Sequence, residues 1–129
     1  VGKEALLFGR SPVRGDAVIV PGTSPDELGG LRGWQWGGSG HALRWGQNII
    51  DQTYTTPEGN HFLLAGFDYD GLPEEAILAA GDSGGGLFLE EGGVWKLAGI
   101  NVAVVADFRT DPEVPASVYS AIFDMGGLY

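Results

Sequence analysis

The sequence contains no cysteine, which excludes disulfides and thiolate zinc sites and leaves no redox argument about compartment. Basic residues are scarce: seven Lys and Arg against 17 Asp and Glu give a net charge of −10. An acidic surface repels phosphate backbones, so we do not expect a nucleic-acid partner. No apolar run approaches the roughly 18 residues of a membrane span, and no glycine-rich dinucleotide loop is present. We therefore expect a globular domain without a membrane span, a metal or a cofactor.

Glycine, in contrast, is abundant. The 129 residues include 23 glycines and seven prolines. These residues favour turns and loops, and there are too many of them for a helical protein. The length corresponds to one domain. Apolar runs alternate with turns at a spacing of roughly 8–12 residues, which is typical of all-β proteins. We predict strands over residues 3–9, 17–20, 47–55, 61–69, 84–89, 94–106 and 117–123.

The segments between these strands are less regular. Residues 31–46 hold three of the four tryptophans and predict either a hairpin or a glycine-rich loop between aromatic strand ends. Residues 10–16 and 107–116 are typical of loops. Residues 70–82 predict a long loop, in which residues 73–80 could form one helical turn because proline and paired acids suit a helix N-terminus. We expect the tryptophans to fill the core or cap its ends rather than to form a binding platform; they are Trp34, Trp36, Trp45 and Trp95.

Ser83 lies in the glycine-rich sequence GDSGG at residues 81–85. A serine hydroxyl becomes a nucleophile only when a base removes its proton, and acyl transfer also needs donors where charge develops on the carbonyl oxygen. Glycines on both sides of a serine allow a tight turn that presents backbone N–H groups. A glycine-rich β-turn without chemistry is the alternative interpretation.

The same residues match G-x-S-x-G, the nucleophile elbow of α/β-hydrolases, which must be followed by a helix. Ser83 is followed instead by three glycines with poor helix propensity, a strand-like run, a turn and a second strand-like run. We therefore disfavour an α/β esterase.

GDSGG, followed by LFL, a turn and WKLAGI, resembles the hallmark of the chymotrypsin/trypsin family of serine proteases. Weaker similarities occur in the family's order: VGKEALLFGR at residues 1–10, RWGQNII at residues 44–50, which is similar to bacterial members, and PASVYSAI at residues 115–122. The resemblance spans nearly the whole chain. It implies that residues 1–129 form a single antiparallel six-stranded Greek-key barrel, the second half of a trypsin-like double barrel.

The resemblance also implies roles for three residues. Ser83 would be the acylating nucleophile of a serine endopeptidase, and its substrate would be a polypeptide. The backbone N–H groups of Gly81 and Ser83 would form the oxyanion hole. Asp82 would be a buried carboxylate that pairs with a new N-terminal ammonium or another cation and so orders the oxyanion loop. An Asx-turn is the other interpretation of Asp82.

The family's substrate pocket corresponds to residues on both sides of the serine. By resemblance its wall would consist of Ile77, Asn101, Val102, Ala103 and Val104. Because Ile77 is not an aspartate, an apolar or small substrate side chain is favoured over Lys or Arg. Loop shifts could still bring in an acid, namely Glu74, Glu75 or Asp107. The cysteines that brace this pocket in animal members are missing, as they often are in bacterial members.

A Ser-His-Asp triad needs a base and an acid that orients it. The two histidines, His41 and His61, lie only 42 and 22 residues before Ser83, whereas the family places its histidine far upstream, on the first barrel. We therefore expect the triad histidine and aspartate on an N-terminal barrel of the same protein, and the start at Val1 rather than Met fits that division. This chain alone would then hydrolyse peptides poorly. The family's bacterial members are usually exported, which implies a secreted or periplasmic location.

Two further interpretations stay open. A non-catalytic trypsin-like β-barrel with a binding or structural role is the alternative to the protease. The intact GDSGG sequence argues against it, because a relative that has lost its activity readily loses the serine or its glycines. Asp68, Asp70 and Glu75 could bind calcium in an oxygen-rich loop. Their spacing is not that of an EF-hand, however, and a solvated acidic loop is the simpler interpretation.

Overall fold

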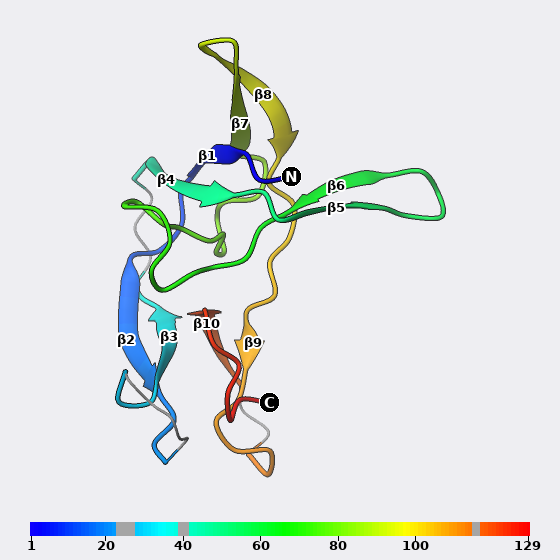
Figure 1. Cartoon of the computed structure of the whole chain (residues 1–129). Helices are drawn as coiled ribbons and strands as arrows, with labels where there is room; N and C mark the ends of the chain where they lie inside the picture. Colours follow the sequence, from blue (N-terminus) through cyan, green and yellow to red (C-terminus); the bar gives the residue numbers. More distant parts are fainter. Residues whose placement is uncertain (23–27, 39–41, 115–116) are drawn as a thin grey trace.

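The computed structural model describes residues 1–22, 28–38, 42–114 and 117–129. These residues form two four-stranded sheets and a two-stranded arm, and all strand pairings are antiparallel (Figure 1). The predicted all-β class is confirmed. Across the described ranges no helix occurs that is long and apolar enough to cross a bilayer.

The first sheet contains the core and carries the serine loop. Its strands, in the order β4-β1-β7-β8, are β4 (Arg44–Ile49), β1 (Glu4–Gly9), β7 (Gly86–Glu91) and β8 (Val94–Ile100). Successive side chains of a strand point to opposite faces, and Ala5 and Leu7 of β1 point inward. They pack with Ile50 and Leu87 into a small buried apolar cluster. The β7–β8 hairpin follows the serine loop directly, as the sequence predicts.

The second sheet lies beside the first (Figure 1). Its strands, in the order β2-β3-β10-β9, are β2 (Arg14–Ile19), β3 (Leu31–Trp36), β10 (Val118–Ile122) and β9 (Asp107–Phe108). β3 and β10 approach so closely at Gly33 that a Cβ there would overlap the carbonyl oxygen of Ala121. Glycine is thus required at this crossing for steric reasons.

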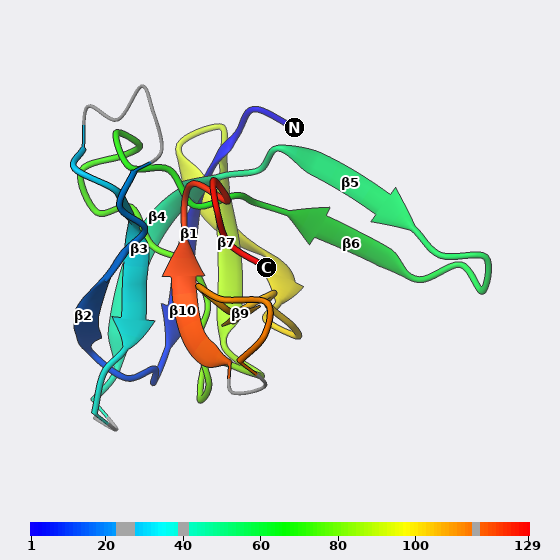
Figure 2. The same ribbon diagram turned by 90° about the horizontal axis from the view of Figure 1, so that it is seen from below.

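The arm consists of β5 (Gln52–Thr55) and β6 (His61–Leu64), which pair only with each other. Both views show it projecting away from the two sheets (Figure 1; Figure 2). Tyr54 and Phe62 stack on it, with ring centroids 6.5 Å apart.

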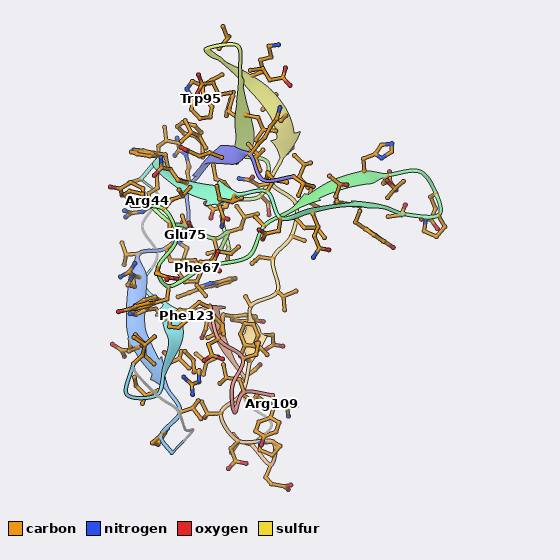
Figure 3. The ribbon with its side chains drawn as sticks, viewed as in Figure 1. Arg44, Phe67, Glu75, Trp95, Arg109 and Phe123 are labelled. Carbon is orange, nitrogen blue, oxygen red and sulfur yellow. The ribbon has the colours of Figure 1, made fainter. Side chains whose placement is uncertain are left out.

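An aromatic cluster joins the second sheet to the connection that follows β6. Phe67 of this connection contacts Trp34 of β3 and Phe123 after β10, with ring centroids 6.2 and 6.4 Å away; Figure 3 shows Phe67 and Phe123 near each other in the middle of the molecule. Trp36 stacks on Tyr119 at 5.3 Å. Trp34 and Trp36 are therefore packed, as predicted.

The same prediction is wrong for the other two tryptophans. Trp45 is 56% exposed and Trp95 is 41% exposed. Each lies on a strand of the first sheet where the outward-facing side chains have no covering layer among the described residues.

Neither four-stranded sheet closes on itself within the described residues, so the six-stranded Greek-key barrel is not confirmed. β8 forms one edge of the first sheet. At the other edge, β4 binds the extended segment at residues 74–76: Gln47 N donates to Glu74 O at 2.7 Å, and Ala76 N donates to Gln47 O at 2.9 Å. The helical turn considered for residues 73–80 is therefore wrong: within this range residues 73, 74 and 80 are in turns, and residues 75–79 form no helix.

Several strand boundaries also differ from the prediction. The segment at residues 47–55 divides at Ile50 and Asp51, because there the chain leaves the first sheet for the arm; Asp51 Oδ2 accepts a hydrogen bond from Gly66 N at 2.6 Å. β3 and β4 lie in different sheets, so residues 31–46 do not form a hairpin. The strands expected at residues 61–69 and 94–106 end at Leu64 and Ile100. The predicted loops at residues 10–16 and 107–116 contain the start of β2 and the short strand β9.

Candidate functional site

The serine loop turns sharply between residues 80 and 85. Gly81 has φ +102° and Gly84 has φ +83°, conformations that disfavour any side chain. Two short-range bonds hold the turn: Asp82 N donates to Ala79 O at 3.1 Å, and Gly85 N donates to Asp82 O at 3.0 Å. Ser83 is exposed at its outer side.

The backbone donors of this loop fall into two groups. The N–H groups of Asp82, Gly84 and Gly85 each donate to a backbone carbonyl. The N–H groups of Gly81 and Ser83 donate to no other group in the described part of the chain. The two unpaired donors therefore belong to the exposed serine itself and to the glycine two residues before it.

The side chain of Asp82 points the other way, into the protein, and is 5% exposed. Its Oδ2 accepts a hydrogen bond from Ala79 N at 2.9 Å. It lies against Gly9 of β1 so closely that a Cβ on Gly9 would overlap the carboxylate. No Lys, Arg or N-terminal ammonium among the described residues forms an ion pair with it. The bond to Ala79 runs three residues back, whereas an Asx-turn bonds two residues forward.

Asn101 fastens the serine loop to β1. It is 5% exposed, and its Nδ2 donates to the carbonyl oxygen of Phe8 at 2.9 Å. Its backbone also forms hydrogen bonds with two glycines of the serine loop: Gly84 N donates to Asn101 O at 2.9 Å, and Asn101 N donates to Gly85 O at 2.8 Å. The sequence predicts Asn101 as a pocket residue, but its side chain is directed to Phe8. No local pattern in the sequence indicates this positioning role, because Phe8 lies 93 residues earlier in the chain.

A small cavity of about 120 Å³ opens on one side of Ser83. Three of the predicted substrate-binding residues, Val102, Ala103 and Val104, line it together with the serine. Ile77 is not among its lining residues; the opposite wall begins one residue later, at Leu78. Trp36, which the sequence does not single out as a site residue, forms a further part of the wall. Apart from Asp82, Ser83 and the indole N–H of Trp36, which has no partner among the described residues, the lining side chains are apolar.

Ser83 also lines a larger cavity, of about 560 Å³. Its side-chain walls are mainly apolar and come from Phe8, Leu43 and Phe88, with Arg10 also in the lining. Its floor consists of the glycines of the serine loop and of Gly9. Ser83 and Gly81 line this cavity, whereas only Ser83 of the two lines the small one. Ser83 therefore lines two cavities of unequal size.

No histidine lines either cavity in the described ranges. His61 is exposed on the arm, where its Nδ1 lies 2.9 Å from Thr55 Oγ1. His41 lies outside the described residues. A histidine base for Ser83 is thus not present among the cavity-lining residues that the structure describes.

The acidic residues before the serine stabilise a loop and are not arranged as a metal site. Within the described chain no group of three or more His, Asp or Glu side chains is arranged to hold an ion. Glu75 accepts hydrogen bonds from Leu72 N at 3.0 Å and Asp68 N at 3.3 Å. Burial raises the pKa of Glu75, while these two backbone bonds act in the opposite direction. Glu75 thus fixes the bend that leads into the wall of the small cavity.

No protein-family model matches the chain, and neither a curated protein nor a solved structure is significantly similar to it.

Proposed function

We propose that Ser83 is the acylating nucleophile of a trypsin-like serine endopeptidase. The observation that carries the proposal is that some backbone N–H groups of the serine loop have a hydrogen-bond acceptor and others do not. The hydroxyl is exposed, and the only two unpaired N–H groups of residues 81–85 are those of Gly81 and Ser83. Acyl transfer needs such donors beside the nucleophile, because negative charge develops on the carbonyl oxygen in the transition state.

The reaction follows from these groups. Ser83 Oγ attacks the carbonyl carbon of the scissile bond while a base takes its proton, and the C=O electron pair moves to the oxygen. The N–H groups of Gly81 and Ser83 donate to that oxyanion. When the intermediate collapses, the C–N bond breaks, and the base returns the proton to the leaving amine. Water then attacks the acyl-enzyme in the same way and releases Ser83 with its proton.

The base and the acid that orients it belong, in this proposal, to an N-terminal barrel of the same protein. His61, the one described histidine, lies on the projecting arm and lines neither cavity, so it does not occupy the position of that base. In this proposal the two sheets of the present chain are the second Greek-key barrel of the pair. The addition of residues 74–76 to the edge of β4 is consistent with a sheet that curves toward closure. Secretion or export to the periplasm belongs to the same proposal, through the family resemblance alone.

The small cavity supports a narrow substrate preference. It adjoins Ser83, contains about 120 Å³ and is bounded by Leu78, Ala79, Ala80 and residues 102–104. Side chains of Ala or Val fit such a space, whereas a charged side chain would find no described Lys or Arg in the lining and only the already bonded Asp82. We therefore propose polypeptides with a small apolar residue on the acyl side of the scissile bond as substrates.

Peptide hydrolysis tests this proposal. The protein is produced with the coding sequence upstream of Val1 included, because the base is expected there, and is compared with Ser83→Ala. Cleavage after Ala or Val that is lost in Ser83→Ala supports the proposal. Cleavage that persists in the variant, or none at all although the upstream sequence encodes a histidine and an aspartate in the family's order, contradicts it.

A non-catalytic β-barrel is the second candidate, and the lack of a histidine at either cavity in the described residues favours it. It predicts that the two cavities bind a peptide without cleaving it. Binding of the same peptides with equal affinity to the native protein and to Ser83→Ala, without product, would identify this function.

A further inference from the structure

We infer that the larger cavity receives a bulky apolar side chain from the residue that follows the scissile bond. The inference rests on the proposed function and deepens it: the substrate would carry a small apolar residue before the cleaved bond and a large aliphatic or aromatic residue after it. Phe8, Leu43 and Phe88 would be the residues that determine the second preference.

The first argument is position. Ser83 lines both cavities, so the two cavities adjoin the same residue. Adjacent residues of a peptide have Cα atoms about 3.8 Å apart. A substrate whose acyl-side side chain lies in the small cavity, with its carbonyl carbon at Ser83 Oγ, then has its next residue within reach of the larger cavity.

The second argument is chemistry. The side-chain walls contain two phenylalanines in edge-to-face contact, with the ring centroids of Phe8 and Phe88 5.6 Å apart, and the exposed Leu43 at the rim. The other lining residues are glycines, Ser83 and Arg10, so Arg10 is the one further long side chain in the described lining. Neither Asp nor Glu lines the cavity. Such a surface favours transfer of an apolar side chain from water.

The third argument is volume. About 560 Å³ lies within the range of roughly 300–1,000 Å³ that is typical of ligand pockets. It is more than four times the small cavity, because 560 divided by 120 is about 4.7. The larger cavity accommodates an aromatic ring together with the main chain that carries it, and the small one does not. The two cavities thus differ in the size of side chain that they admit while sharing an apolar character.

The acyl-enzyme can react either with water or with an added amine. The ratio of these two reactions measures the preference for the residue after the scissile bond separately from the acylation step. The protein with its upstream region is acylated by a peptide p-nitrophenyl ester ending in Ala, in the presence of a free amino-acid amide. The amine nitrogen attacks the acyl carbon, the bond to Ser83 Oγ breaks, and the amine proton passes through the base to Ser83. Water competes in the same step. The ratio of peptide product to hydrolysed product, measured by mass spectrometry, reports binding of the amide on the leaving-group side.

We expect phenylalanine and leucine amides to be incorporated about tenfold or more better than alanine amide, as a hydrophobic pocket discriminates side chains of different size. Leu43→Asp should reduce that ratio toward one, because it places a carboxylate at the rim of the cavity. Leu43 is 68% exposed, so this variant should fold. Val105→Asp is the matched control: Val105 is 83% exposed and lines neither cavity.

The outcomes separate the inference from the function on which it rests. Equal incorporation of all amides, or equal effects of Leu43→Asp and Val105→Asp, overturns the inference while leaving Ser83 acylated. If no Ser83-dependent acyl-enzyme forms, with Ser83→Ala releasing nitrophenol as fast as the native protein, the proposed function fails and the inference fails with it.

Discussion

The carboxylate of Asp82 occupies the space that a side chain on residue 9 would fill. Gly9 ends β1, and Asp82 lies 73 residues later, beside Ser83. The missing Cβ at residue 9 lets the carboxylate reach Ala79 N at 2.9 Å and remain 5% exposed. The position of the serine loop therefore depends on a glycine in a distant strand.

Gly9→Ala should displace Asp82 and distort the serine loop. We expect a loss of about 1–3 kcal/mol in the free energy of unfolding, as is usual for overpacking, and a greatly reduced rate of Ser83 acylation. Denaturant unfolding and probe labelling measure the two effects. Gly38→Ala is the control, because a Cβ there meets nothing within 4 Å. Equal behaviour of both variants would show that Asp82 does not need this space.

Asn101→Asp should detach the serine loop from β1. The carboxylate has no N–H group to donate to Phe8 O, and it places a charge where the side chain is 5% exposed. Leaving one buried acceptor unpaired costs about 1–3 kcal/mol, and we expect at least that loss of stability. In an active protein kcat should fall more than KM rises, since Asn101 lines neither cavity. A rise in KM alone would contradict the positioning role.

Ala103→Leu should close the small cavity. Its lining position beside Ser83 leads us to expect that cleavage after Val decreases by about 10–200-fold relative to cleavage after Gly, the range for a crowded hydrophobic pocket. Ala98→Leu is the matched control on β8, because Ala98 is exposed and lines neither cavity. Profiling with a peptide library gives both ratios. An unchanged profile in Ala103→Leu would place the acyl-side pocket elsewhere.

Glu75 should make the protein less stable as the pH rises. Burial holds the pKa of Glu75 above its ordinary value of 4.5, so its contribution to stability is fully present below pH 4.5 and is lost as the pH rises through the raised folded pKa. Glu75→Gln should remove this dependence. An NMR titration of the Glu75 carboxyl group should have its midpoint above 4.5, and a midpoint at or below that value contradicts the assignment.

The contribution of Glu91 to stability should depend on pH in the opposite direction. A hydrogen bond from Lys96, 3.0 Å away, lowers the pKa of Glu91. Its contribution to stability is therefore present above pH 4.5 and is lost as the pH falls through the lowered folded pKa. Comparing Glu91→Gln with Glu75→Gln across this range should give differences of opposite sign.

Local sequence patterns predicted the strand class because they reflect local preferences. The apolar run that forms β1 and the glycines of the turn between β7 and β8 follow directly from local preferences. The sequence predicts that turn at residues 90–93, but Glu90 and Glu91 belong to β7 and only residues 92 and 93 form the turn. The partition of strands into sheets depends on distant contacts, which no local pattern contains. The split at Ile50, for example, depends on a bond between Asp51 and Gly66.

The site shows the same limit. The GDSGG sequence indicated Ser83 and its neighbours, and the family resemblance indicated residues 102–104, which line the small cavity. The roles of Gly9, Asn101 and Trp36 arise from contacts across more than 40 residues of sequence, so no spacing in the chain could have predicted them.

A fluorophosphonate probe tests the central claim most directly, because it reacts only with an activated serine. The protein is produced with its upstream region, treated with the probe and digested, and the labelled peptide is identified by mass spectrometry. We predict one phosphonylated residue, Ser83, no labelling in Ser83→Ala, and far weaker labelling of residues 1–129 alone. Absence of label on Ser83 in the longer protein, or label at another residue that survives Ser83→Ala, would contradict the account.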